Sequence, residues 1–94
     1  MTVQIVKLIT GEEIVGEIEQ GDEFIIKNPC ILQMIASRQD PTQPAMTLIP
    51  YAFYVEENTI KVGKDFIVWV GNPVKEIYNR YNSIFGSGIQ LASL

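Results

Sequence analysis

VKLITGEEIVGEIEQGD, residues 6–22, is the stretch of this chain that decides the fold. On both sides of Gly11, apolar residues alternate with polar or charged ones, which is typical of two half-buried β-strands joined by a tight turn. Gly16 stands inside the second of these strands, where a glycine marks a bend or a bulge. The stretch therefore predicts a small, strongly bent antiparallel sheet.

The segments next to this stretch extend it into a meander of three strands. The expected strands and the turns between them are residues 2–9, 10–12, 13–20, 21–22 and 23–35. Short connections that contain glycine join antiparallel neighbours, so these strands should pair in sequence order. Pro29 cannot donate a hydrogen bond to a strand ladder, and Asn28-Pro29 therefore predicts a bend or bulge in the third strand.

Further strands are predicted in the second half of the chain. Residues 36–45 are polar and contain two prolines, which is typical of an exposed loop. The strands expected after it are residues 46–55, 59–62 and 66–70. Pro50 restricts the first of these to a sheet edge or a bulge, and such an edge can accept a strand from another chain.

A helix is predicted near the C-terminal end. Apolar residues recur there at helical spacing, at Val74, Ile77, Tyr78, Tyr81 and Phe85. Asn72 is suited to cap this helix, Pro73 to open it and Gly86 to end it. The helix should lie on the sheet with its two tyrosines inward.

Length and composition predict one folding unit, a β domain at 1–73 with a C-terminal amphipathic helix and short tail at 74–94 packed on it. Hydrophobic residues make up 47% of the chain, more than so small a core needs, which predicts that some of them face another subunit. Cys30 is the only cysteine, which excludes an internal disulfide and fits a reducing, cytoplasmic setting. No apolar stretch approaches the length of a membrane span.

Charge and residue types argue against several functions. The formal net charge is −4, so any binding of nucleic acid would need a local basic site. The chain has no histidine, the commonest general base, and Gly11, Gly16 and Gly21 do not form a phosphate-binding loop that opens a helix. We expect no catalytic residues, no metal site and no cofactor, and we interpret the chain as a non-enzyme.

Two parts of the sequence resemble a known family. The spacing from Val6 to Asp22 resembles the first motif of Sm and Sm-like proteins, and WVGNPV at 69–74 is similar to their second, shorter motif. More narrowly, the chain resembles divergent Sm-like proteins attributed to marine cyanophage. The resemblance implies a mainly β fold, a strongly bent five-stranded antiparallel barrel-like sheet, here with a C-terminal helix instead of the usual N-terminal one.

The resemblance also implies an assembly and a ligand. Sm-like subunits close into a homo-oligomeric ring, of about five to seven subunits, by pairing the fourth strand of one subunit with the fifth of the next. The implied ligand is single-stranded RNA, bound near the central pore in the cytoplasm, which is that of the host cell if the protein is phage-encoded. The residues that we expect at the subunit interface are Leu48, Tyr51, Phe53, Ile67 and Trp69.

The family's RNA site maps onto the residues that follow Asp22. Phe24 stands where the family often has an aromatic residue or a histidine that stacks on a base, although it is also interpretable as a buried strand residue. Asn28 is the amide nearest to the position of the family's base-reading asparagine, and Lys27 lies beside it. We therefore expect an RNA site to consist of Phe24, Lys27 and Asn28.

Two functions stay open at this point. In the first, the ring binds single-stranded RNA through this diverged site, as an RNA chaperone or in post-transcriptional regulation. In the second, the ring is a protein-interaction or scaffold module that has lost the RNA pocket. Ile26 and Val70 favour the second, because they stand where the family has its asparagine and a basic residue.

Overall fold

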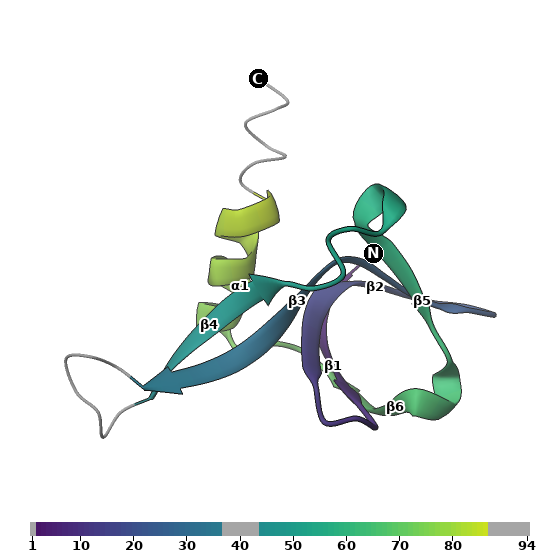
Figure 1. Ribbon diagram of the computed structural model, residues 1–94, viewed down its shortest axis with the longest axis horizontal. Coiled ribbons are helices and arrows are strands. Elements are labelled where there is room, and N and C mark those ends of the chain that lie inside the picture. Colours follow the sequence, from purple (N-terminus) through teal and green to yellow (C-terminus); the bar gives the residue numbers. More distant parts are fainter. Residues whose placement is uncertain (1, 37–43, 87–94) are drawn as a thin grey trace.

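A computed structural model describes residues 2–36 and 44–86 of the chain (Figure 1). The described part is mainly β, with antiparallel strands and a helix at its C-terminal end. The strands are β1 (Thr2–Leu8), β2 (Glu13–Gln20), β3 (Phe24–Ala36), β4 (Pro44–Pro50), β5 (Thr59–Val62) and β6 (Ile67–Gly71). The helical segments are η1 (Glu56–Asn58), η2 (Lys64–Phe66), α1 (Lys75–Tyr81) and η3 (Asn82–Gly86).

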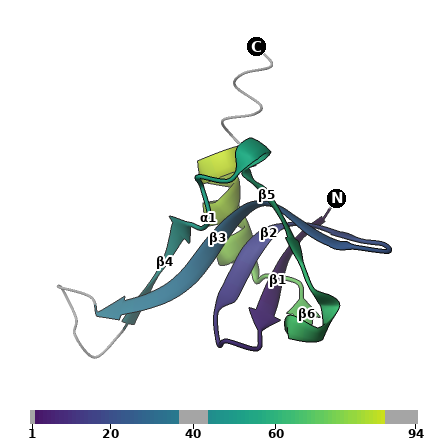
Figure 2. The same ribbon diagram turned by 45° about the vertical axis from the view of Figure 1, so that its right-hand side comes forward.

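The strands form one sheet in the order β4-β3-β2-β1-β6, and β5 also pairs with β3. The predicted meander of the first three strands is confirmed, since β1 pairs with β2 and β2 with β3, all antiparallel. β3 has two partners along its length, β5 at residues 24–27 and β4 at residues 30–36. The sheet curls around a barrel-like interior, while the β3–β4 hairpin projects away from it (Figures 1 and 2).

The bend in β2 and β3 lies where the sequence predicts it. The register between the two strands shifts between Val15 and Glu17, opposite Asn28 and Pro29. Asn28 adopts a left-handed backbone conformation with φ of 52°. A Cβ atom on Gly16 would lie 2.5 Å from Ile26 Cγ2 and 3.2 Å from the carbonyl oxygen of Lys27, so β3 packs against the bare backbone of this glycine.

Both faces of the sheet are buried in its central part. The barrel core contains Val6, Leu8, Ile14, Ile18, Phe24 and Ile26. A second, outer core lies under the helix and contains Val15, Cys30, Leu48, Ile77 and Tyr81. Successive residues of a strand point to opposite faces, and Ile14 and Val15 are both fully buried, one in each core. Part of the apolar excess that the sequence analysis assigned to another subunit therefore packs under α1.

The C-terminal helix differs from its prediction at two points. The residue before its first turn is Val74, in extended conformation, and Asn72 instead accepts a hydrogen bond from Gln4 Nε2 at 3.3 Å. Of the two tyrosines expected inward, Tyr81 is buried, whereas Tyr78 is 44% exposed. Tyr81 follows Ile77 by four residues and shares its face, while Tyr78 lies at the margin of that face.

The strand predicted at 46–55 is also wrong in its second half. β4 ends at Pro50, and residues 51–55 form a turn before η1. Pro50 lacks a backbone N–H and ends the pairing of β4 with β3 opposite Cys30, as a proline at a strand end does. Most of the loop predicted at 36–45, and the tail beyond residue 86, lie outside the described residues.

Candidate functional site

Three strands of the sheet have a second edge that is unpaired within the part of the chain that the structure describes. β6 pairs only with β1, and both β4 and β5 pair only with β3. Arg80 Nη1 donates to the carbonyl oxygen of Met46 at 2.6 Å, so α1 occupies one acceptor of β4. Large apolar side chains are exposed on and beside these strands, namely Ile49, Phe53, Phe66, Val68 and Trp69. An unpaired edge with apolar neighbours is a surface suited to strand addition.

The five interface residues expected from the sequence lie in different surroundings. Phe53 is 72% exposed and Trp69 is 42% exposed, so both are available to a partner. Tyr51 and Ile67 are half-buried against the barrel core, and Leu48 is buried under α1. Leu48 therefore cannot reach a second subunit while the helix is in place.

Sequence reasoning missed several of the exposed apolar residues near these edges. Val68 and Phe66 are more than half exposed, and Tyr54 is 82% exposed. The uninterrupted apolar run FIVWV at 66–70 is typical of a fully buried strand, and only the three-dimensional structure shows that this strand lies at an edge. A run of apolar residues indicates burial, but it does not tell whether the strand lies in the middle of the sheet or at its edge.

The three residues expected at the RNA site do not share one surface. Phe24 is only 3% exposed and belongs to the barrel core, whereas Lys27 is exposed. Asn28 is half-buried, and its side chain is engaged on both sides. It donates from Nδ2 to Glu17 Oε2 at 3.1 Å, and its Oδ1 accepts from Asn58 Nδ2 at 3.0 Å. In this arrangement Asn28 fixes the bend in β3.

Tyr81 ties α1 to the same bend. Its hydroxyl group donates to the carbonyl oxygen of Asn28 at 2.8 Å and lies 3.3 Å from that of Lys27. Burial raises the pKa of Tyr81 above its usual value, and the negative charge of Glu17 raises it further. The phenol therefore stays protonated and can donate at physiological pH.

A hollow of about 430 Å³ lies between the β2–β3 turn and η2. Its lining includes Gly21, Phe24, Lys64, Ile67 and Val70. Lys64 Nζ donates to the carbonyl oxygen of Gly21, which links the turn at the end of the first sequence motif to the segment before the second. Phe24 and Lys64 thus both line this hollow.

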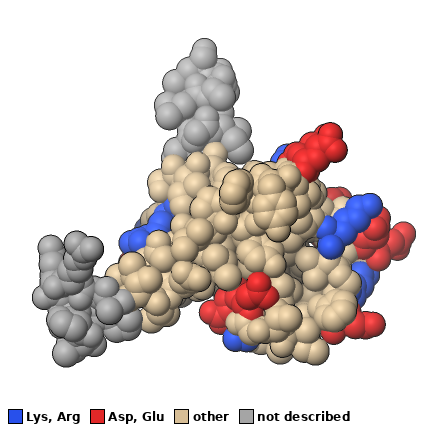
Figure 3. All heavy atoms as spheres, in the orientation of Figure 1, with Lys and Arg blue, Asp and Glu red and all other residues tan. Residues whose placement is uncertain are grey.

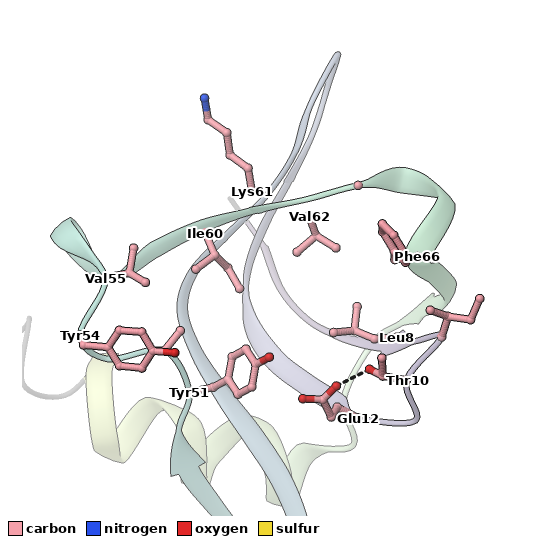
Figure 4. Close-up of a pocket in the computed structure, with 13 residues that line it drawn as sticks. Leu8, Thr10, Glu12, Tyr51, Tyr54, Val55, Ile60, Lys61, Val62 and Phe66 are labelled. Carbon is pink, nitrogen blue, oxygen red and sulfur yellow. Dashed lines mark hydrogen bonds between the residues drawn. The ribbon is translucent and has the colours of Figure 1, made fainter.

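A larger hollow, of about 570 Å³, opens at one end of the barrel (Figure 4). We call it the barrel mouth. Two parts of the chain form it, residues 8–12 and 51–66, and its lining includes Leu8, Thr10, Glu12, Tyr51, Tyr54, Ile60, Lys61, Val62 and Phe66. Its wall is mostly apolar and aromatic, with the polar side chains of Thr10, Glu12 and Tyr51 gathered on one side (Figure 4).

Glu12 is held in place by its neighbours in the barrel mouth. Thr10 Oγ1 donates to Glu12 Oε1, and the backbone amide of Leu8 donates to the carbonyl oxygen of Glu12 at 2.9 Å. Burial raises the pKa of Tyr51, and the charge of Glu12 and a hydrogen bond to its side chain raise it further. The hydroxyl groups of Thr10 and Tyr51 thus both face the Glu12 carboxylate.

The Cys30 thiol is buried, and two lysines form ion pairs. Burial raises the pKa of Cys30 to about 11, so its thiol is protonated at neutral pH. Lys7 pairs with Glu13 at 3.9 Å and Lys61 with Glu23 at 3.3 Å. Within the described residues, no three cysteine or acidic side chains come together as metal ligands.

Figure 3 shows charged side chains gathered on the barrel side of the molecule, whereas the centre of this face is largely uncharged.

In the described ranges, none of the helices has the length and apolar character needed to cross a bilayer. Comparison with known proteins assigns the chain to no family, because neither a family model nor a curated protein matches it.

Proposed function

We propose that this chain is an Sm-like protein that assembles with itself into a closed ring and serves as a protein-interaction module. The single observation that carries the proposal is the second edge of β6, which lacks a partner within the described residues and has the exposed side chains of Val68 and Trp69. In a ring, this edge would pair with β4 of the next subunit. Each subunit would then offer one edge and accept the other, which closes a cycle.

The bent sheet supports the Sm-like part of the proposal. The resemblance implies a strongly bent barrel-like sheet, and β2 and β3 bend at Gly16 and Asn28. The last strand returns to pair with β1 beside the first motif, so the two motifs lie next to each other. A bent sheet with unpaired edges on separate strands has the geometry that head-to-tail strand addition needs.

Two of the three residues expected at the RNA site, Phe24 and Asn28, favour interaction with proteins over interaction with RNA. Phe24 and Ile26 are buried in the barrel core, and the Asn28 amide is engaged by Glu17 and Asn58. A base would therefore find neither an open ring nor a free amide at these positions.

The ring is tested by native mass spectrometry of the purified chain. The wild-type protein should give one closed oligomer. Val68→Lys places a charge on the proposed interface and should release monomers, because a lysine there would have to be desolvated. Val74→Lys, which also changes an exposed valine but lies outside the strand edges, is the control and should keep the oligomer. A monodisperse wild-type monomer at micromolar concentration would refute the ring.

Single-stranded RNA is the second candidate ligand, and the hollow beside Phe24 is the observation that favours it. A phosphate would pair with Lys64 at its rim. Titration with labelled uridine-rich and adenine-rich strands tests this function. Binding that weakens in Lys64→Ala, but not in the control Lys75→Ala, would support it. Absence of binding at low salt would exclude it.

A further inference from the structure

The barrel mouth combines an apolar surface with one acidic group. Leu8, Ile60 and Val62 form part of its wall, and Glu12 lies on one side with the hydroxyl groups of Thr10 and Tyr51 (Figure 4). Pockets that bind ligands are typically mostly apolar, with a few polar groups at fixed positions, and the mouths of β-barrels are common places for them. This hollow, of about 570 Å³, lies within the usual size range of such pockets.

The Glu12 carboxylate accepts hydrogen bonds but has no basic partner in the part of the chain that the structure describes. The ion pairs there join Lys7 to Glu13 and Lys61 to Glu23, and neither includes Glu12. The turn that carries Glu12 is fixed by the bond from the Gly11 amide to the carbonyl oxygen of Leu8, at 2.9 Å. A carboxylate held in this way is preorganised to pair with a cation that arrives from outside.

The surrounding charge favours a cation over a phosphate. The segments that border the mouth, residues 8–12 and 51–66, carry four carboxylates and two lysines. They are Glu12, Glu56, Glu57, Asp65, Lys61 and Lys64. Lys61 is paired with Glu23, and Lys64 donates to the carbonyl oxygen of Gly21. A nucleic acid would meet a net negative surface here, whereas a basic side chain would be attracted to it.

Exposed aromatic rings make the mouth broad rather than enclosed. Tyr54 is 82% exposed and Phe66 is 57% exposed, and they lie on opposite sides of the opening (Figure 4). Aromatic rings attract cations to their faces and also cover apolar side chains. A ligand that covers both rings and also reaches Glu12 must span the opening, which an extended peptide does better than a small ion.

We propose that the barrel mouth docks a short extended segment of a partner protein, in which one lysine or arginine pairs with Glu12 and apolar neighbours cover Tyr54 and Phe66. This inference rests on the proposed role as an interaction module, and it names the chemistry of the partner. Three features of the structure support one occupant: the carboxylate without a basic partner, the acidic border and the exposed rings.

The test is a fluorescence titration of the intact assembly with a short capped peptide in which an arginine stands between leucine and phenylalanine. A second peptide with citrulline, the uncharged isostere of arginine, isolates the charge. The arginine peptide should bind about tenfold more tightly, as expected for a hydrogen bond to a charged group. Glu12→Gln should reduce its affinity to that of the citrulline peptide. Glu13→Gln is the matched control, because Glu13 pairs with Lys7, and it should leave the affinity unchanged.

A second variant and a second ligand complete the experiment. If Glu12→Gln fails to fold, Phe66→Ala replaces it, since this ring is exposed and should weaken the binding of both peptides. Absence of peptide binding to the native assembly, or an equal loss in Glu13→Gln, would overturn the docking site. Butylguanidinium that binds as tightly as the arginine peptide would overturn the assignment to a protein segment.

Native mass spectrometry of the same samples separates this inference from the proposed ring. A ring that binds neither peptide refutes the docking site and leaves the assembly standing. A monomer that binds the arginine peptide in a Glu12-dependent way refutes the ring and leaves the docking site standing.

Discussion

Gly16 is the residue at which the bend of β2 tolerates no side chain. A Cβ atom there would meet Ile26 and the backbone of β3. Gly16→Ala should therefore lower the free energy of unfolding by about 2 kcal/mol, as overpacking of a well-packed core does. Gly21→Ala is the control, because a Cβ at Gly21 has no neighbour within 4 Å, and its effect should stay within about 0.5 kcal/mol. Equal effects in urea denaturation would contradict this account of the bend.

Cys30 makes the free energy of unfolding depend on pH in the alkaline range. Burial raises its pKa from 9.0 to about 11 in the folded state. Because the pKa is higher in the folded state, the contribution of the protonated Cys30 thiol to the free energy of unfolding is complete below pH 9. This contribution is lost as the pH rises through 11. The free energy of unfolding should therefore fall more steeply over this range in the wild type than in Cys30→Ala. Parallel curves in urea denaturation would show that the thiol does not titrate with this shift.

For single residues, the sequence predicts the roles of those that act on their own strand and misses the roles of those that contact distant parts of the chain. Gly16 and Pro29 disturb their own strands, so their roles in the bend follow from the sequence. Tyr81 donates to the carbonyl oxygen of Asn28, 53 residues away, and no local pattern predicts that pairing. The barrel mouth could not be predicted either, because Glu12, Tyr51 and Phe66 come from separate segments.

Helix α1 closes the outer core, and Ile77 is its main apolar contact besides Tyr81. Ile77 is 2% exposed and packs in the cluster that contains Val15 and Cys30. Ile77→Ala should lower the free energy of unfolding by about 3 kcal/mol, as truncation of a buried isoleucine does. Ile84→Ala, at a residue that is 41% exposed, is the control and should cost less than about 1 kcal/mol. Similar losses in both variants would mean that the packing of α1 does not stabilise the sheet.

The elements themselves were predicted well where a period was clear. The three strands of the meander and the last strand lie within two residues of their expected bounds. The second half of the strand expected at 46–55 was wrong, because Tyr51 packs on the barrel core from a turn instead of a ladder. Apolar alternation reports burial, and a turn that lies on a core produces the same signal.

For the whole molecule, the proposed ring makes thermal stability depend on concentration. If subunits pair through β6, assembly stabilises the folded state by mass action. The Tm of the wild type should rise by a few degrees for a tenfold increase in protein concentration, and the Tm of Val68→Lys should not change. Differential scanning calorimetry at several concentrations measures both. A wild-type Tm that is independent of concentration, together with a monomeric mass, would contradict assembly.

β3 takes part in both cores, and this has a consequence for how the molecule opens. Its first half contributes Phe24 and Ile26 to the barrel core, and its second half carries Cys30 in the outer core. The two cores cannot separate unless β3 loses its pairing with the neighbouring strands. Local opening of the structure therefore does not include β3. In hydrogen–deuterium exchange, the paired amides of β3 should exchange only through global unfolding, as one cooperative unit, while the short strand β5 releases its protons earlier. The two parts of β3 on either side of the bend at Asn28 would then unfold together, in a single event.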